Sequence, residues 1–281
     1  MILGIDLGST TTKIVLMDGL KILQTSRIDR QDAYDAFLTG IDLSKVTKIM
    51  VTGAGAAGVS ENILGIPTEH VEEFRAAALG GYFLSGLERC MVVSLGTGTS
   101  FVYVERDKRE HAGGTGIGGA LLKTLAGIGL GMTDVGAFLE LGNRGTIQNA
   151  DLLISDISPI PIDNLYGDVT AANMAKLNQE STPEDYAFGV CNLIFQNVAV
   201  MAVMADRPYK TGKVVVMGSI GQTPVARRCF ELVGKLFGYE FIIPENALYG
   251  VAVGAILQGN DDYINSFSVY GMEDDVDYIF E

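Results

Sequence analysis

Residues 1–13 read MILGIDLGSTTTK, an apolar run that carries one aspartate, Asp6, and then changes to glycine and hydroxyl residues. The apolar residues predict a buried strand that ends near Leu7, and Gly8 predicts a turn. A carboxylate at the end of a buried strand is costly unless it is paired or binds a cation. Two explanations are open: Asp6 accepts the N–H groups of its own hairpin turn, or the turn holds phosphate and a metal ion.

A second stretch repeats this pattern 88 residues later. Residues 92–110, VVSLGTGTSFVYVERDKRE, align with residues 4–22, GIDLGSTTTKIVLMDGLKI, and this places Ser9 on Thr97. Both copies run strand, Gly/Thr turn, strand, charged turn and next strand. Two glycine-turn hairpins can be alike by chance, but repetition of the whole order of elements indicates an internal duplication.

The rest of the chain alternates predicted strands and helices, which is typical of an α/β protein. Two similar halves predict two lobes with a cleft between them. We expect an N-terminal lobe at 1–88, a C-terminal lobe at 89–258 and an acidic tail at 259–281, which has seven acids and neither lysine nor arginine. The predicted elements outside the hairpins are strands at 46–51, 213–217 and 240–244 and helices at 70–84, 183–205, 224–237 and 245–259.

Charge and cysteine content restrict the partners and the compartment. The 281-residue chain has a formal net charge of −14, which argues against nucleic acid or an anionic membrane surface as a partner. Cys90, Cys191 and Cys229 lie far apart without metal-ligand spacing, and this fits a reducing compartment. The chain lacks a signal-peptide pattern and a run of about 18 or more apolar residues. We therefore expect a cytoplasmic protein without a membrane span.

Glycine turns offer backbone N–H groups to phosphate without an obstructing Cβ. Residues 8–13, 96–100 and 113–119 are three candidate phosphate loops, and residues 218–221, which follow a strand, could lie under the base or ribose. Each loop alone is more often an ordinary turn. Together, with two related by the repeat, they favour a nucleotide site in which Asp6 holds Mg²⁺ directly or through water. Lys13 is either a phosphate ligand or an ordinary strand-edge lysine.

The hairpins DLGSTTTK and SLGTGTS resemble those of the acetate and sugar kinase/heat-shock chaperone/actin superfamily. More narrowly, the motifs HVEEFRAA, GGTGIGG, GDVTAAN, VVMGSIG and ENALYGVAVGAI appear in the order found in type II pantothenate kinases, over about residues 1–258. The resemblance implies a two-lobed actin-like ATPase fold built from a duplicated ribonuclease H-like unit, with the nucleotide in the cleft. It also implies a homodimer that uses ATP and Mg²⁺ to phosphorylate the primary hydroxyl of pantothenate, the first step of coenzyme A biosynthesis.

The resemblance assigns roles to individual residues. Glu73, directly before the phenylalanine of HVEEFRAA, takes the place of the general base, and Glu72 is the alternative one residue away. Without the resemblance, Glu73 is one of several acids on a solvated helix start. The residues implied to contact ATP are Asp6, Leu7, Gly8, Ser9, Thr10, Thr11, Thr12, Lys13, Thr97, Gly118, Gly119, Ala120, Leu121, Leu122 and Ser219, with Asp6 also the metal ligand.

Two departures from the family pattern bear on the acceptor. His111 stands where the family has an arginine, so either His111 or Arg109 replaces it near the reacting groups, or the chemistry differs. We expect His111 to be the second catalytic residue beside Glu73; the alternative is a strand-end histidine without a role. Ala120 replaces a glycine of the third loop. The segment GDVTAAN, residues 167–173, is expected to be a loop and helix start capped by Asp168 or Thr170.

Other functions stay open at this point. One is a kinase that acts on a different small hydroxyl compound. Another is an ATPase activator that passes electrons through an iron–sulfur cluster at a dimer interface, although the three cysteines show no suitable pattern. A third is a nucleotide-binding regulator that has lost catalysis, for which His111 and Ala120 are the hints.

Overall fold

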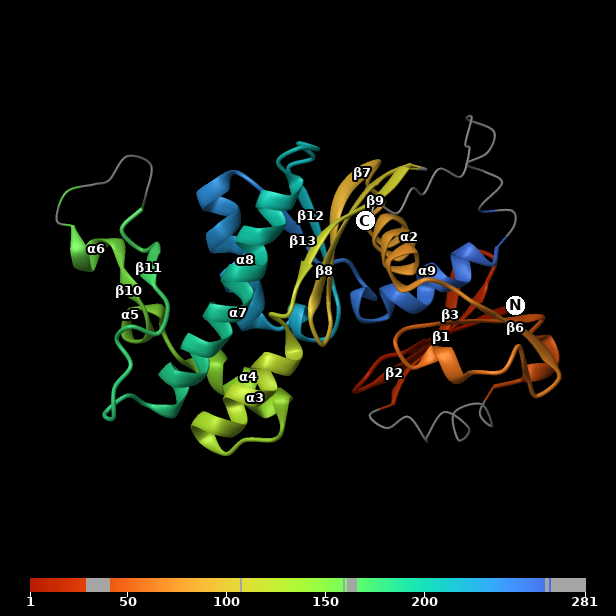
Figure 1. The fold of residues 1–281 in the computed structure, drawn as a ribbon, viewed down its shortest axis with the longest axis horizontal. Helices are drawn as coiled ribbons and strands as arrows, with labels where there is room; N and C mark the ends of the chain where they lie inside the picture. Colours follow the sequence, from red (N-terminus) through yellow and green to blue (C-terminus); the bar gives the residue numbers. More distant parts are fainter. Residues whose placement is uncertain (29–40, 107, 159, 161–165, 261–262, 264–281) are drawn as a thin grey trace, which may run out of the picture.

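The fold comes from a computed structural model that describes residues 1–28, 41–106, 108–158, 160, 166–260 and 263. It contains two mixed β-sheets with helices between them and on the outer face of the second (Figure 1). The acidic tail expected at 259–281 lies almost wholly outside the described residues. Of its aromatic residues only Tyr263 is described, and its ring lies edge-on to Phe83, with 6.0 Å between ring centroids.

The first sheet has the strand order β3-β2-β1-β4-β6-β5. Strands β1 and β2 form an antiparallel hairpin through the Gly/Thr turn, whereas β4 pairs parallel to β1. Strands β1 and β2 are almost entirely buried, as their apolar runs predict. The strands are β1 (Ile2–Leu7), β2 (Thr12–Asp18), β3 (Lys21–Ile28), β4 (Lys48–Thr52), β5 (Asn62–Ile63) and β6 (Ile66–His70).

The second sheet repeats this arrangement. Its order is β13-β12-β7-β8-β9, so β9-β8-β7-β12-β13 corresponds strand for strand to β3-β2-β1-β4-β6. The antiparallel and parallel pairings also correspond, and both β2–β3 and β8–β9 contain a register shift. The predicted duplication is therefore confirmed. The strands are β7 (Arg89–Leu95), β8 (Thr99–Glu105), β9 (Lys108–Thr115), β12 (Lys213–Met217) and β13 (Glu240–Ile242).

Two helices, α2 (Glu73–Ser85) and α9 (Gly250–Gln258), lie between the sheets (Figure 1). Helix α2 contacts β7 and β8, and α9 contacts β1 and β4. The C-terminal helix thus packs on the first sheet, although it follows the second in sequence. The two helices cross closely: a Cβ on Gly80 would lie 1.8 Å from the Gly250 carbonyl oxygen, and one on Gly254 would lie 1.8 Å from that of Ala76.

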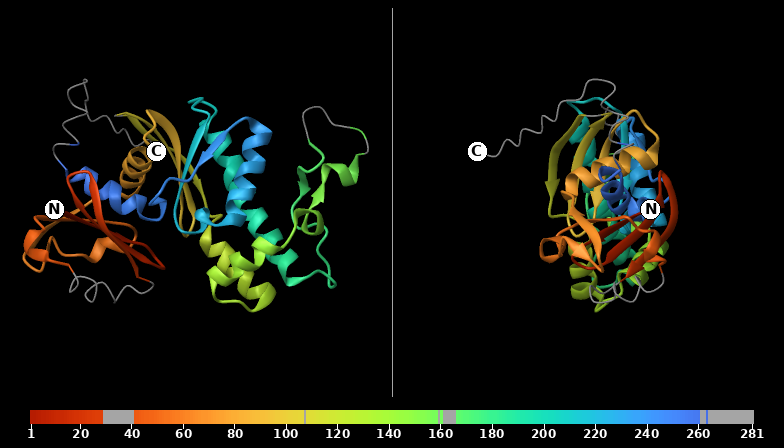
Figure 2. Two further views of the ribbon diagram at one scale, coloured as in Figure 1. Left: turned by 180° about the vertical axis from the view of Figure 1, so that it is seen from behind. Right: turned by 90° about the vertical axis from the view of Figure 1, so that its right-hand side faces the viewer.

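The remaining long helices cover the other face of the second sheet (Figure 2). Alternate residues of β7 divide between the two faces, because Val93 packs with α7 (Pro183–Asp206) and Val92 packs with α2. Helix α7 is long and apolar enough by composition to cross a membrane, yet 67% of its most apolar window is buried inside this protein. The other helices are α3 (Gly119–Leu130), α4 (Val135–Arg144), α5 (Ile147–Ala150), α6 (Ile154–Ile157) and α8 (Pro224–Phe237).

The prediction of a helix start in residues 167–173 is wrong. Thr170–Ala172 forms a short strand, β11, which pairs with β10 (Leu152–Leu153). The Thr170 hydroxyl donates a 2.9 Å hydrogen bond to the buried carboxylate of Asp151, which also accepts the backbone N–H of Met174 at 2.8 Å. This buried carboxylate fixes the segment in an extended form that local capping preference does not reveal.

Candidate functional site

The Asp6 carboxylate is paired across the first hairpin. Asp6 and Lys13 face each other in the β1–β2 register, and Lys13 Nζ lies 3.1 Å from Asp6 Oδ2. Asp6 is 7% exposed. Burial raises the pKa of Asp6, and the charge of Lys13 opposes that rise. The structure therefore pairs Asp6 with a cationic side chain. This differs from the first explanation, in which Asp6 accepts the N–H groups of its own turn.

A glycine after β4 lies directly against Asp6, and the sequence analysis missed it. Gly53 has φ +92°, and a Cβ placed on it would lie 2.8 Å from Asp6 Oδ1 and 2.7 Å from the Leu7 carbonyl oxygen. The same carbonyl accepts the Gly55 N–H at 2.9 Å. The signal was the loop TGAGAAG directly after a buried strand, because parallel neighbours such as β1 and β4 end at the same sheet edge.

The two Gly/Thr hairpins, which contain the candidate phosphate loops at residues 8–13 and 96–100, meet at their tips. Ser9 Oγ and Thr97 Oγ1 lie 2.5 Å apart and share a hydrogen bond. Both side chains are exposed, as is that of Thr10. Thr11 is half-buried and Thr12 is fully buried. The first hairpin thus offers its hydroxyls at residues 9–11 and keeps Thr12 inside.

The third glycine loop packs on the second hairpin. The Gly119 N–H donates to the Gly96 carbonyl at 2.8 Å, and the Ala120 N–H donates to the Thr97 carbonyl at 3.0 Å. A Cβ on Gly118 would lie 2.7 Å from the Thr97 carbonyl oxygen. These two N–H groups, expected to face phosphate, bind the neighbouring hairpin in this structure, and Gly118 allows the two backbones to approach.

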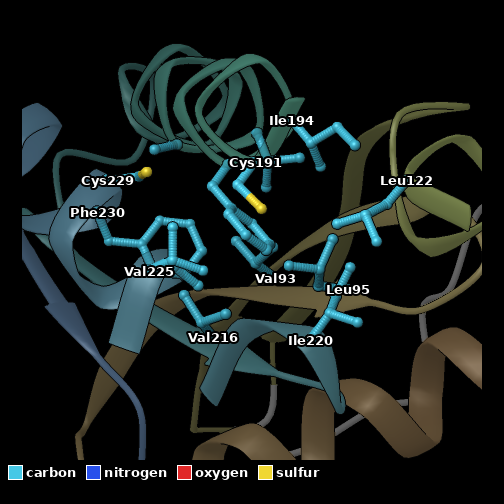
Figure 3. Packing of buried hydrophobic residues seen from close by; sticks show 14 of the residues in the cluster. Val93, Leu95, Leu122, Cys191, Ile194, Val216, Ile220, Val225, Cys229 and Phe230 are labelled. Carbon is cyan, nitrogen blue, oxygen red and sulfur yellow. The ribbon is translucent and has the colours of Figure 1, made fainter. Parts of the chain in front are cut away.

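Two apolar residues implied to contact ATP, Leu7 and Leu122, have buried side chains. Leu122 is fully buried and packs among Val93, Leu95 and Ile194 in the core of the second lobe (Figure 3). Leu7 is buried in the core of the first lobe. These residues can offer only backbone groups to a ligand. Leu121 is half-buried and Ala120 is exposed.

The fourth loop joins the same region. Gly218, with φ +105°, follows β12, and a Cβ on it would lie 2.1 Å from the Leu95 carbonyl oxygen. Ser219 comes next and is half-buried. The Ile220 side chain would lie 3.7 Å from a Cβ on Gly119. The structure therefore brings together all four loops that the sequence singled out.

Glu72 and Glu73 have different environments at the start of α2. The Glu72 carboxylate accepts the backbone N–H groups of Phe74 at 2.9 Å and Arg75 at 2.8 Å, so it is the N-cap. Glu73 is the first helical residue. Burial and the charge of Asp6 raise its pKa, and Lys13 lowers it. Of the two glutamates, Glu73 is thus the one whose pKa is shifted by Asp6 and Lys13 of the first hairpin.

His111 also lies near the start of α2. Its ring stacks on that of Phe74, with centroids 4.3 Å apart and planes inclined by 21°. His111 belongs to β9, opposite Val102, so the contact joins α2 to the second sheet. The structure therefore brings His111 next to the residue that follows Glu73.

Comparison with known proteins identifies the family. The family model described as Fumble matches residues 87–228, half of the chain. The chain belongs to the Fumble family. It is similar to the type II pantothenate kinase of Staphylococcus aureus strain MRSA252, with 28% identity over 269 residues that cover 92% of this chain and 100% of the relative. For strain USA300 the identity is also 28%, over 91% of this chain and 98% of the relative. The resemblance inferred from the motifs is confirmed.

Solved structures show the fold of this Fumble-family chain. The activator of 2-hydroxyisocaproyl-CoA dehydratase from Clostridium difficile with bound ADPNP superposes with a TM-score of 0.66 at 18% identity, over 97% of this chain and 98% of that one. A ROK family glucokinase from Streptomyces griseus in complex with glucose and AMPPNP gives a TM-score of 0.53 at 15% identity, over 90% and 97%. The predicted actin-like ATPase fold is confirmed.

Proposed function

We propose that this protein transfers the γ-phosphoryl group of ATP to the primary hydroxyl of pantothenate, the first step of coenzyme A biosynthesis. Relatives named type II pantothenate kinase match it over their full or nearly full length. The observation that carries the proposal is that Glu73 begins α2 and that its pKa responds to the charges of Asp6 and Lys13, which face each other in the first hairpin. A carboxylate next to a phosphate loop suits proton removal from an attacking hydroxyl.

ATP binds, in this proposal, across the four loops. Phosphates contact the hydroxyl and N–H groups of residues 8–11 and Thr97, with Lys13 supplying positive charge. The base and ribose lie toward Ser219, and the start of α3 at residues 118–122 borders the phosphates. Because the Gly119 and Ala120 N–H groups already bind carbonyls of the second hairpin, the α3 loop supports that hairpin as much as it binds ligand.

Asp6 is the residue that fits a magnesium ion. Mg²⁺ in nucleotide sites is held by one or two carboxylates together with phosphate oxygens and water. Within the described residues no group of three or more His, Cys, Asp or Glu side chains could hold a metal alone, so phosphate would have to complete the site. Bound there, the ion neutralises charge on the transferring phosphoryl group.

Glu73 performs the proton transfer. It accepts the proton of the primary hydroxyl while that oxygen bonds to the γ-phosphorus and the bond from phosphorus to the β,γ-bridging oxygen breaks, which releases ADP. Its raised pKa makes it a stronger base than an ordinary glutamate. Glu72 cannot serve as well, because both of its oxygens accept backbone N–H groups.

The test is ADP formation by the purified protein with and without pantothenate, with the product identified by mass spectrometry. We expect pantothenate-dependent ADP and one 4′-phosphopantothenate per ADP. Turnover with another hydroxyl compound but not with pantothenate would keep the kinase and refute the acceptor. A rate of ATP hydrolysis that no added hydroxyl compound changes would favour an ATPase activator or a nucleotide-binding regulator.

The alternative function, an ATPase activator that passes electrons through an iron–sulfur cluster, is supported only by the similarity of the fold to solved structures. Cys90, Cys191 and Cys229 are free and buried. Burial raises the pKa of the Cys90 and Cys191 thiols to about 12. Cluster ligands must be thiolates, so these positions argue against an iron–sulfur centre within one chain.

We also propose a cytoplasmic homodimer without nucleic-acid or membrane partners. Three free cysteines fit a reducing compartment, and the net charge of −14 disfavours anionic partners. The dimer rests on the family resemblance. The long apolar helix α7 does not supply the interface in this proposal, because its apolar face is largely buried in this chain's own core: Phe188, Ile194 and Phe195 are at most 3% exposed.

A further inference from the structure

The ring stack between Phe74 and His111 connects the first turn of α2 to the second sheet. The centroids are 4.3 Å apart, and the planes are inclined by 21°. The buried residues of α2 begin only at Ala76, so Phe74, which is 36% exposed, belongs to the part of the helix that core packing does not hold. The stack is thus a side-chain contact that ties this exposed turn to β9.

Phe74 directly follows Glu73, and this makes the stack a constraint on the candidate base. The Phe74 N–H is held at 2.9 Å by Glu72, and its ring is held by His111. The backbone of residue 73 is therefore fixed by a cap on one side and a ring contact on the other. Groups that transfer protons need placement to within about an ångström, and a 1 Å error can cost roughly a hundredfold in rate.

We propose that Phe74 and His111 are positioning residues, and that His111 acts through the flat face of its ring on Phe74 to hold the Glu73 carboxylate, not through a charge on the phosphoryl group. The inference rests on the proposed function, in which Glu73 is the base. It changes the role of His111 expected from its alignment with a family arginine.

Two substitutions at His111 separate the two roles. His111→Phe keeps a planar ring and removes the possibility of charge, whereas His111→Lys keeps a positive charge and removes the ring. If the stack positions Glu73, His111→Phe retains kcat within about twofold and His111→Lys lowers it roughly ten- to a hundredfold, with KM for ATP nearly unchanged in both. The reverse order would overturn the proposal and assign His111 a charge role.

A spectroscopic test does not depend on turnover. The chain has two histidines, His70 and His111, so the ring-proton NMR signals are few and assignable. Phe74→Leu should remove the ring-current shift of the His111 protons and leave those of His70, which contacts the Val59 carbonyl, in place. An unchanged His111 signal would show that the rings do not stack in solution, whether or not the protein phosphorylates pantothenate.

Amide hydrogen exchange tests positioning itself. Loss of the stack should speed exchange of the backbone N–H groups at positions 74 and 75 in Phe74→Leu and His111→Lys, but not in His111→Phe. Equal protection in all three variants would overturn the positioning role. If wild-type protein shows no pantothenate-dependent ADP, the proposed function fails, and this exchange pattern still decides whether the stack orders the first turn.

Phe83→Leu is the matched control on the same helix. Phe83 lies near the other end of α2, and its ring contacts Tyr263 at 6.0 Å between centroids. This variant should lower the melting temperature and keep kcat within about twofold. Loss of packing far from the site reduces the stability of the protein and leaves the placement of Glu73 unchanged. Phe74→Leu, which removes the stack, should lower kcat as His111→Lys does. If Phe83→Leu lowers kcat by as much, general loosening of α2 explains both effects and the proposal is wrong.

Discussion

Ser9 Oγ and Thr97 Oγ1, which occupy equivalent positions in the two copies of the repeat, lie 2.5 Å apart and share a hydrogen bond. The internal duplication therefore gives two similar hairpins that point at each other. Each hairpin continues from a buried strand, β1 or β7, so the positions of the two tips are fixed by the cores of the two lobes. The contact marks the place where both lobes approach the proposed phosphates of ATP.

Removal of either hydroxyl should weaken ATP binding. Ser9→Ala and Thr97→Ala each lose a hydrogen-bonding group at the proposed phosphate site, and we expect KM for ATP to rise about tenfold, equivalent to roughly 1.4 kcal/mol. Because the two hydroxyls contact each other, the double variant should cost less than the sum of the single ones. Ser44→Ala is the control: Ser44 makes an exposed 2.5 Å hydrogen bond to Asp42, and its loss should leave KM unchanged.

Substitutions of Glu73 and Glu72 should affect different quantities most strongly, the rate for Glu73 and the stability for Glu72. Glu73→Gln removes the base, and kcat should fall about 10²- to 10⁴-fold while ATP binding and melting temperature hold. Glu72→Ala removes the N-cap acceptor of two N–H groups, so it should cost about 1 kcal/mol of stability and lower kcat only through the placement of Glu73, by less than Glu73→Gln does. Steady-state kinetics, nucleotide titration and thermal unfolding check both. A Glu73→Gln enzyme with a near-normal rate would rule out the base assignment.

The rate should fall in acid through the raised pKa of Glu73. The base works when deprotonated, so kcat falls as the pH drops through the pKa of Glu73. Burial, and to a smaller extent the charge of Asp6, raise this pKa above the usual value for glutamate, about 4.3. Glu72 contributes a smaller rise. Glu72→Gln removes that negative charge, and the acid limb of the pH–rate profile should move to lower pH. Glu231→Gln, on α8 and away from the site, should leave the limb in place.

How much the sequence predicted differs from one feature to the next. The hairpins at residues 8–13 and 96–100 and the shared order of strands follow from strand periodicity and glycine placement, which are local signals. Helix α8 was predicted at 224–237 and forms there, because Pro224 begins it and Gly238, at φ +72°, ends it.

Features that depend on contacts between distant segments were missed. Gly53 matters because β4 pairs parallel to β1 and brings it against Asp6. Residues 170–172 form a strand because Asp151, a distant buried carboxylate, holds Thr170 and the Met174 N–H. The N–H groups of Gly119 and Ala120, at the start of α3, bind carbonyls of the second hairpin. The spacing of glycines in the sequence cannot distinguish this use of the N–H groups from phosphate binding. The assigned roles of the site residues and the lobe boundaries at 88 and 258 stay predictions.

The crossing of α2 and α9 should not tolerate a methyl group. Gly80→Ala or Gly254→Ala places a Cβ 1.8 Å from a backbone carbonyl oxygen, so the helices must separate. Overpacking of this kind costs typically 1–3 kcal/mol, and we expect a clear fall in the free energy of unfolding in denaturant titrations. Gly58→Ala is the control, since a Cβ there meets nothing within 4 Å. If Gly80→Ala and Gly58→Ala unfold at the same denaturant concentration, the close crossing is absent in solution.

The three cysteines should be unreactive in the native protein. The thiolate is the reactive form, and burial raises the pKa of Cys90 and Cys191 to about 12 and that of Cys229 higher still. All three are at most 1% exposed. Titration with 5,5′-dithiobis(2-nitrobenzoate) at pH 8 should therefore detect no thiol within minutes in native protein and three in guanidinium chloride. Cysteines that hold a cluster at a dimer interface lie near the surface of the separated chains. Rapid reaction of any native thiol would contradict the buried positions and reopen the activator alternative.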